Sequence, residues 1–254
     1  TTTTTIIAEL LRAAGRTVHL GGNIGRPLLA DTPSMKPTDL AVLELSSFQL
    51  LTMNRSPQIA IVTNLAPNHL DVHRDYEEYI AAKENIFTHQ DSSGIVVLNA
   101  DNDVTRGFAE GARGSVRLFS RREAVERGAY LGPDDSGGGQ AIWLASEGGH
   151  RLVLPLADIK LPGIHNVENY MAAIAAVDGL VPDGVIREFA RNFGGVEHRI
   201  ELVRELDGVR WYNDSIASSP SRTIAGLKAF PGKVILIAGG KDKGISYDSL
   251  GPVV

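Results

Sequence analysis

A carboxylate lies at the end of the most strand-like apolar run in the sequence. The stretch "AVLELSSFQL", residues 41–50, stays apolar until Glu44 and then continues with Ser46, Ser47 and Gln49. A strand end that frays into a polar turn would explain these residues. A binding site at the carboxyl edge of a parallel sheet, where open α/β sheets place their ligands, would explain them equally well. The run alone leaves both interpretations open.

The threonines at the start of the chain are a second candidate for chemistry. "TTTTTII" runs directly into an amphipathic pattern, which is compatible with a simple polar helix start. The other interpretation is a chain that begins just after the Lys of a phosphate loop of the form G-x-x-G-K-[ST], whose Ser or Thr holds the magnesium of a bound nucleotide. On that interpretation Thr1 and Thr2 belong to a nucleotide site, and we expect the sequence to be a fragment of a longer protein.

The elements that must position these residues alternate along the first half of the chain. Helical patterns cover residues 3–15, 75–87 and 165–180. Asp75 can cap the start of the second of these helices. Alternation of strands and helices predicts a parallel sheet wrapped by helices. The predicted strands are 17–21, 39–45, 59–65, 94–100 and 115–120.

The rest of the chain departs from this alternation twice. Short β-prone pieces within 129–161 are separated by "PDDSGGG" and "SEGG", which predicts a small antiparallel insertion. After "NFGGVEHR" the pattern restarts with "IELVREL", "VRWYND", a helix near 220–229 and the apolar run "KVILIAGG" at 233–240. We therefore expect an α/β protein with a central parallel-sheet domain over 1–195, which the phosphate-loop interpretation would make an ATP-binding domain, and an incomplete Rossmann-like α/β domain over 196–254.

Composition limits the classes of function. The chain has 254 residues, a net charge of −5 and no Cys, which excludes disulfides and thiolate chemistry. The acidic balance argues against a nucleic-acid binder, which needs a basic face. The sequence contains neither an apolar run of membrane-spanning length nor a signal-peptide pattern, so we expect a cytoplasmic protein with no membrane partner. We also expect a monomer.

The order and spacing of eight motifs resemble the Mur ligase family. Within it, the pair "GGNIG" and "ELSSFQL" is most similar to members that add D-glutamate to UDP-N-acetylmuramoyl-L-alanine. The resemblance implies a ligase that uses ATP and Mg²⁺ and works through an acyl phosphate in peptidoglycan precursor synthesis. The motifs are "GGNIG", "LELSSFQL", "TNLAPNHLDVH", "YIAAKENIF", "LPGIHNVENYMAA", "GGVEHRIE", "VRWYNDSIA" and "LIAGGKDKG".

The resemblance also implies roles around the phosphates and the acyl acceptor. Thr1 and Glu44 would serve one magnesium ion and His69 a second, with Glu44, His69 and Lys83 as the catalytic set. Asn23, Ser46 and Gln49 would hold the acyl acceptor, and Lys243 the incoming glutamate, whose carboxylates suit a cation. By its surroundings Lys83 is an ordinary solvated lysine. In the family the matching Lys carries a CO₂-derived carbamate and serves the metal site, which requires a neutral amine.

The remaining implied roles concern the nucleotide. Asn166 and Asn169 lie three residues apart, so they share one helix face, and their amides suit a nucleobase edge; Asn166 could also cap its helix. Arg199 and Asp214 match positions that contact ATP. In "NDSIASSPSR" an apolar Ile216 stands where some members have Lys, so either Arg222 replaces that Lys or a phosphate contact is missing.

Two alternative functions and several histidines complete the expectations. The chain could belong to another Mur-type or folylpolyglutamate-type ligase, or to a nucleotide-binding module without catalysis. His198 is expected to be structural, and His73, His89 and His150 are expected at the surface.

Overall fold

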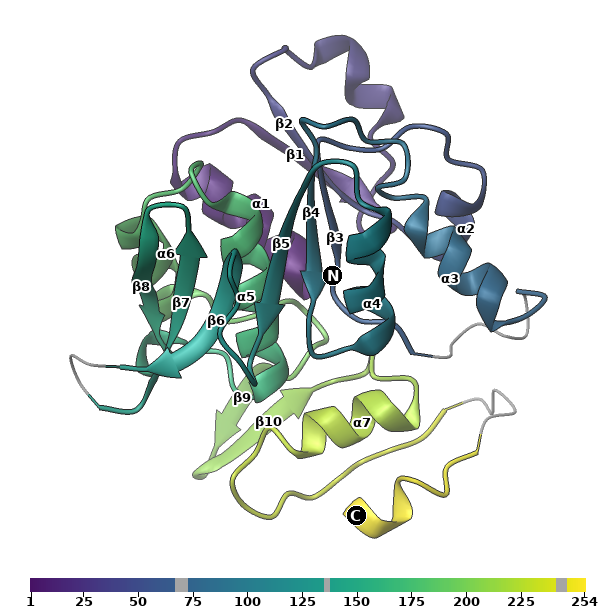
Figure 1. The fold of residues 1–254 in the computed structure, drawn as a ribbon. Coiled ribbons are helices and arrows are strands. Elements are labelled where there is room, and N and C mark those ends of the chain that lie inside the picture. The colour runs from purple at the N-terminus through teal and green to yellow at the C-terminus, as the bar shows by residue number, and fades with distance from the viewer. Residues whose placement is uncertain (67–72, 135–137, 241–245) are drawn as a thin grey trace.

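The computed structural model describes residues 1–66, 73–134, 138–240 and 246–254, and a six-stranded sheet lies at its centre (Figure 1). The four strands from β3 to β6 are parallel, and β7 and β8 add to the β6 edge as antiparallel strands. The antiparallel segment expected in the sequence is therefore present, and it continues the main sheet. In sheet order the strands are β3 (Ile59–Val62), β4 (Ile95–Asn99), β5 (Ser115–Ser120), β6 (Gly128–Pro133), β7 (Gln140–Ser146) and β8 (Gly149–Pro155).

Helices cover both faces of this sheet and bury a separate core on each side. On one face α1 (Thr2–Ala13), α5 (Ile164–Val177) and α6 (Asp183–Asn192) pack together, and the chain buries Ile6, Leu10, Tyr170 and Ile174 there. On the other face α3 (Tyr76–Glu84) and α4 (Asp103–Gly107) enclose Phe87 and Phe108. Strand β4 contributes to both cores because it is buried on both faces, as its continuous apolar run predicts. Short 3₁₀ turns lie at Leu29–Ser34, Phe108–Gly111 and Leu156–Asp158.

Two further parallel strands, β1 (Val18–Gly22) and β2 (Leu40–Glu44), pair with each other. Gly22 lies opposite Glu44 with φ of 99°, and a Cβ at Gly22 would fall 2.3 Å from the Glu44 carbonyl oxygen. Only glycine allows this approach, which explains the second glycine of "GGNIG". The short helix α2 (Ser47–Leu51) follows β2 directly.

The C-terminal part forms an antiparallel hairpin and one helix below the main sheet in Figure 1. The hairpin consists of β9 (Glu201–Leu206) and β10 (Val209–Asn213), followed by α7 (Pro220–Leu227) and a 3₁₀ turn at Gly251–Val253. The apolar run at 233–240, where the restarted α/β pattern favours a strand, forms none, and Ile235 and Ile237 are 94% and 81% exposed. A strand requires a partner, and β9 pairs only with β10 among the described strands.

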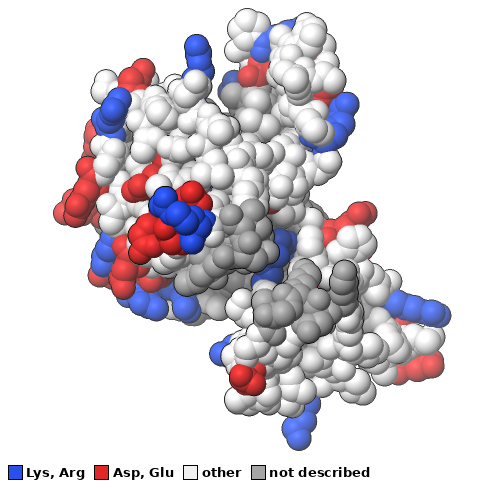
Figure 2. Space-filling model, turned by 90° about the vertical axis from the view of Figure 1, so that its right-hand side faces the viewer, with Lys and Arg blue, Asp and Glu red and all other residues white. Residues whose placement is uncertain are grey.

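The surface and helix lengths add two observations. Within the described ranges, no helix is long and apolar enough to cross a membrane. On the face shown in Figure 2, Lys and Arg side chains are interspersed with Asp and Glu.

Candidate active site

Glu44 ends β2 and lies beside the start of α1. The Asn23 amide donates to the Glu44 carbonyl at 2.7 Å, and Asn23 Nδ2 donates to Glu44 Oε1 at 3.4 Å. The second carboxylate oxygen, Oε2, is buried without a hydrogen bond of good geometry and lies 2.8 Å from the backbone nitrogen of Thr1. The Thr1 side chain makes no capping hydrogen bond to α1. The Glu44 carboxylate and the Thr1 hydroxyl thus belong to adjacent residues at this sheet edge.

Lys83 is not the solvated surface lysine that its local sequence suggests. The residue is half-buried on α3, and Nζ donates to the Leu45 carbonyl at 3.4 Å. Burial lowers the pKa of the Lys83 amine, and the negative charge of Glu44 acts in the opposite direction. A lowered pKa increases the fraction of neutral amine at a given pH, which is the form that reacts with CO₂.

The polar residues that follow Glu44 have local partners. Ser46 is the N-cap of α2: its hydroxyl accepts from the Gln49 amide at 3.3 Å, and Gln49 Oε1 accepts from the Ser46 amide at 2.8 Å. This reciprocal pair is a capping box. Ser47 is buried and bonded to His73. The polar-turn interpretation therefore holds for these side chains, while Glu44 remains the residue without an equivalent local explanation.

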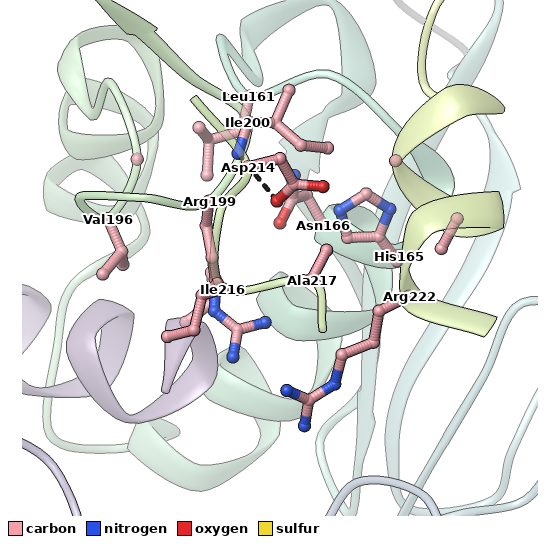
Figure 3. Close-up of a pocket in the computed structure, with 14 residues that line it drawn as sticks. Leu161, His165, Asn166, Val196, Arg199, Ile200, Asp214, Ile216, Ala217 and Arg222 are labelled. Carbon is pink, nitrogen blue, oxygen red and sulfur yellow. Dashed lines mark hydrogen bonds between the residues drawn. The ribbon is translucent and has the colours of Figure 1, made fainter. Parts of the chain in front are cut away.

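A pocket opens between α1, the start of α5, the segments that flank the β9–β10 hairpin, and α7 (Figure 3). Its empty volume, including the open mouth, is about 620 Å³. Four residues that the sequence assigned to a nucleotide line it together. They are Thr2, Asn166, Arg199 and Asp214.

Two arginines reach the same side of this pocket. Figure 3 shows the guanidinium groups of Arg199 and Arg222 near each other, one from the loop before β9 and one from α7. Arg199 is half-buried, and its Nε is buried without a hydrogen-bond partner. Burial is the main cause that lowers the pKa of its guanidinium, and the positive charge of Arg222 lowers this pKa further. Two cations held this close, one with an unpaired buried donor, favour an anionic ligand between them.

The backbone around Arg199 is strained. His198 and Ile200, which flank it, have φ of 64° and 46°. For a β-branched residue such as Ile200 this left-handed conformation is a genuine outlier, and each such residue costs about 1–3 kcal/mol. His198 is held by Asn213 at 2.8 Å, as expected for a structural residue, and the Ile200 amide donates to Asp214 Oδ1 at 3.2 Å. The contacts with β10 and its end therefore hold Arg199 in the pocket.

The amides of α5 form a hydrogen-bonded chain, which confirms that they share a face. Asn169 Nδ2 donates to Asn166 Oδ1 at 3.2 Å, and Thr3 Oγ1 donates to Asn169 Oδ1 at 2.7 Å. Asn166 is not the N-cap, because Gly163 is. Asn169 and Arg199 line a second pocket that also borders Thr63, at the carboxyl end of β3.

His165 is the site residue that the sequence analysis did not single out. It lines both pockets. Burial lowers the pKa of its imidazole, the charge of Asp214 raises that pKa, and the charge of Arg199 lowers it further. Its place directly before Asn166 in "GIHNVEN" was the available signal.

Two of the expected site residues lie outside the described part of the chain, and the expectation for His73 is wrong. His69 and Lys243 lie outside the described residues. Among the described residues, no group of three or more His, Cys, Asp and Glu side chains could hold a metal ion. His73, expected at the surface, is 3% exposed because it packs between α2 and α3. His89 and His150 are exposed, as expected.

The three-layer α/β fold has polar residues and arginines at the carboxyl edge of its sheet, which is where open α/β folds bind their ligands. The sequence profile of the Mur ligase middle domain matches residues 1–177, and the chain belongs to the Mur ligase family.

Similar proteins with curated names agree with this family. A UDP-N-acetylmuramoylalanine–D-glutamate ligase of Acetivibrio thermocellus is 56% identical over 254 residues, which is 100% of this chain and 53% of the relative. The protein of the same name in Clostridium kluyveri is 51% identical over 250 residues, 98% of this chain and 52% of the relative. The chain thus spans about half the length of these relatives.

Solved structures show the same fold at lower sequence identity. A UDP-N-acetylmuramoyl-L-alanyl-D-glutamate–2,6-diaminopimelate ligase matches with a TM-score of 0.63 and 24% identity, over 90% of this chain and 51% of that one. A murein peptide ligase of Psychrobacter arcticus matches with a TM-score of 0.60 and 19% identity, over 90% of this chain and 52% of that one.

Proposed function

We propose that the complete protein containing this chain joins D-glutamate to UDP-N-acetylmuramoyl-L-alanine in an ATP-dependent reaction. A carboxylate oxygen of the acceptor attacks the γ-phosphorus of ATP, ADP leaves, and an acyl phosphate forms. The amine of D-glutamate then attacks the acyl carbon, inorganic phosphate leaves with the bonding electrons, and the nitrogen loses a proton to give the amide. The observation that carries this proposal is that Arg199 and Arg222 line one pocket. Negative charge develops on phosphate oxygens in both steps, and arginine side chains can neutralise it.

The proposed phosphate site combines these arginines with the start of α1. Backbone amides at a helix N-terminus attract anions, and Thr2 at this end lines the pocket. Arg199 offers a buried donor without a partner. These groups would neutralise the developing charge on the transferred phosphoryl group, which is the main catalytic requirement of such transfers.

The proposed nucleoside site lies along the first turns of α5. The amides of Asn166 and Asn169 offer both donors and acceptors to a base, and Asp214 offers carboxylate oxygens to ribose hydroxyls. Burial raises the pKa of the Asp214 carboxyl, which is opposed by the Ile200 amide and by Arg199.

Magnesium fits the donors near the start of α1. Mg²⁺ uses one or two carboxylates together with water and phosphate oxygens, so an all-protein cage is not needed. We propose that Glu44, through its buried Oε2, and Thr1, through its hydroxyl, hold such an ion, with His69 and the carbamate of Lys83 at a second one. When bound, the ion neutralises part of the phosphate charge.

We propose that the acceptor lies on the side of Asn23, Ser46 and Gln49, and that Lys243 meets the incoming glutamate. The names of the similar proteins favour D-glutamate over the other amino acids that related ligases add.

A panel of amino acids tests the reaction. We expect the complete protein to release phosphate from ATP with UDP-N-acetylmuramoyl-L-alanine and D-glutamate together, and to form the amide product detectable by mass spectrometry. L-glutamate, L-alanine and a diamino acid serve as comparisons at equal concentration. Preference for one of those would indicate a different ligase, and ATP binding without product would indicate a non-catalytic module.

Replacing Arg222 tests whether it takes the place of the missing Lys at Ile216. Loss of a charge-assisted contact costs about 1.5–3 kcal/mol, so Arg222→Ala should raise the KM for ATP by about tenfold or more. Arg222→Lys should retain part of the affinity because it keeps the charge. The exposed Arg16 provides a matched control, Arg16→Ala, which should behave as wild type. An unchanged KM for ATP in Arg222→Ala would exclude Arg222 from the phosphate site.

A further inference from the structure

His73 joins two helices that carry proposed site residues. Its ring is 3% exposed, and Nε2 lies 2.8 Å from the hydroxyl of Ser47 at the start of α2. The ring stacks on Phe48, with centroids 4.9 Å apart and planes 7° apart. On its other side it meets the edge of Tyr79 on α3 at 5.3 Å.

Helix α2 depends on such contacts for its orientation. It has five residues, and a helix this short is not stable in water without tertiary packing. Its capping box fixes the backbone of the first turn internally, but it does not orient the helix relative to the sheet. The hydrogen bond between Ser47 and His73 has a preferred direction, so it restricts the rotation of α2. The stacking of Phe48 on His73 restricts only the distance between the two rings. His73 therefore restricts both the position and the rotation of α2 near its start, while Asn85 at the end of α3 donates to the Leu50 carbonyl at 3.0 Å near its end.

The consequence reaches Lys83 through α3. Tyr79 and Lys83 are four residues apart on this helix, so they lie on one face, with Lys83 Nζ 6.0 Å from the centre of the Tyr79 ring. Lys83 also donates to Leu45, the residue that connects Glu44 to the N-cap of α2. A shift of α2 relative to α3 would change the separation of Lys83 from the Ser46 turn.

The opposite ring nitrogen of His73 has a weaker neighbour. Nδ1 lies 3.4 Å from Glu78 Oε2 without hydrogen-bond geometry, and that oxygen accepts from the Arg74 amide at 2.9 Å. The hydrogen bond at Nε2 is therefore the contact that specifies the ring orientation.

We propose that His73 is a positioning residue for the acyl-acceptor side of the site. It holds the Ser46 turn and Lys83 at a fixed separation through the bond from Nε2 to Ser47 and through its stack on Phe48. This role rests on the proposed function and adds to it a residue that does not itself touch the reacting groups.

Substitutions that move or remove the Nε2 contact test this role in the complete protein. Small misplacements of reacting groups reduce rates strongly. His73→Asn should therefore raise the KM for UDP-N-acetylmuramoyl-L-alanine, or lower kcat, by about tenfold or more. The KM for ATP should stay within about twofold of the wild-type value. His73→Gln should recover part of this loss, because its side-chain amide reaches the place of Nε2. The matched control is His89→Asn at an exposed histidine, which should be kinetically silent.

Ser47→Ala provides a second variant if His73→Asn fails to fold. It removes the same hydrogen bond and leaves the imidazole in place, so we expect the same pattern with a smaller loss. The double variant should lose less than the product of the two single losses, because both remove one shared contact. A lowered melting temperature with unchanged acceptor KM and kcat, or equal effects on the KM for ATP and acceptor, would overturn the positioning role. An inactive wild-type protein would contradict the proposed function itself.

Discussion

Lys83→Ala is expected to reduce the ligation rate of the complete protein by a factor on the order of 10² or more. The proposed chemistry begins with the neutral amine, whose nitrogen attacks the carbon of CO₂ and loses a proton to give a carbamate anion. Burial lowers the pKa of Lys83, which increases the neutral fraction at neutral pH. Alanine removes the anion that this reaction would place near Glu44. Steady-state measurement of phosphate release with both substrates provides the test.

Two further variants separate the carbamate from a simple cation. Lys83→Arg keeps a positive charge that cannot react with CO₂, so it should be as inactive as the alanine variant. A small carboxylate in solution should partly restore Lys83→Ala, because it can occupy the vacated anion position. Lys160→Ala, at an exposed lysine, should match wild type. A fully active Lys83→Arg protein, or an unmodified ammonium at Lys83 in a crystal grown with bicarbonate, would contradict the carbamate.

Glu44→Gln is the second change with a large expected effect. It preserves the volume of the side chain and the acceptor oxygen for Asn23, but it removes the charge of the carboxylate proposed to hold magnesium. We expect turnover at ordinary Mg²⁺ concentration to fall by a factor on the order of 10² or more. A titration of the rate with Mg²⁺ should show a higher concentration at half-maximal activity.

The control for Glu44→Gln is the same change at a surface ion pair. Glu147 is 87% exposed in its pair with Arg127, and exposed pairs contribute about 0–1 kcal/mol. Glu147→Gln should therefore leave both turnover and the Mg²⁺ dependence unchanged. If Glu44→Gln were as active as this control at every Mg²⁺ concentration, Glu44 would have no place in the metal site.

The elements could be predicted from the sequence where local residues determine them. The apolar run of β4 specifies a strand buried on both faces, and Asp75 caps α3 as its sequence predicts. The spacing of Asn166 and Asn169 was enough to place them on one face of α5, where their side chains are hydrogen-bonded. Periodicity and capping depend on neighbours a few residues away, so they can be read along the chain.

The partners of the individual side chains were decided by the tertiary structure. Sequence placed His73 at the surface, but the packing of α2 against α3 buries it, and burial on α3 likewise gives Lys83 its lowered pKa. The apolar run at 233–240 predicts a strand as strongly as β4 does, yet it forms none.

The pocket lined by Arg199 and Arg222 shows the same difference between what the sequence and what the tertiary structure determine. The family resemblance that the motifs carry identified Glu44, Arg199 and Asp214 as candidates, and it left the role of Arg222 open. Only the folded chain brings Arg222 on α7 beside Arg199 and the start of α1, and it holds Arg199 between two residues with positive φ. Contacts between residues far apart in the chain depend on how whole helices and sheets pack, and that information is spread over the buried residues of both cores rather than present at the site residues.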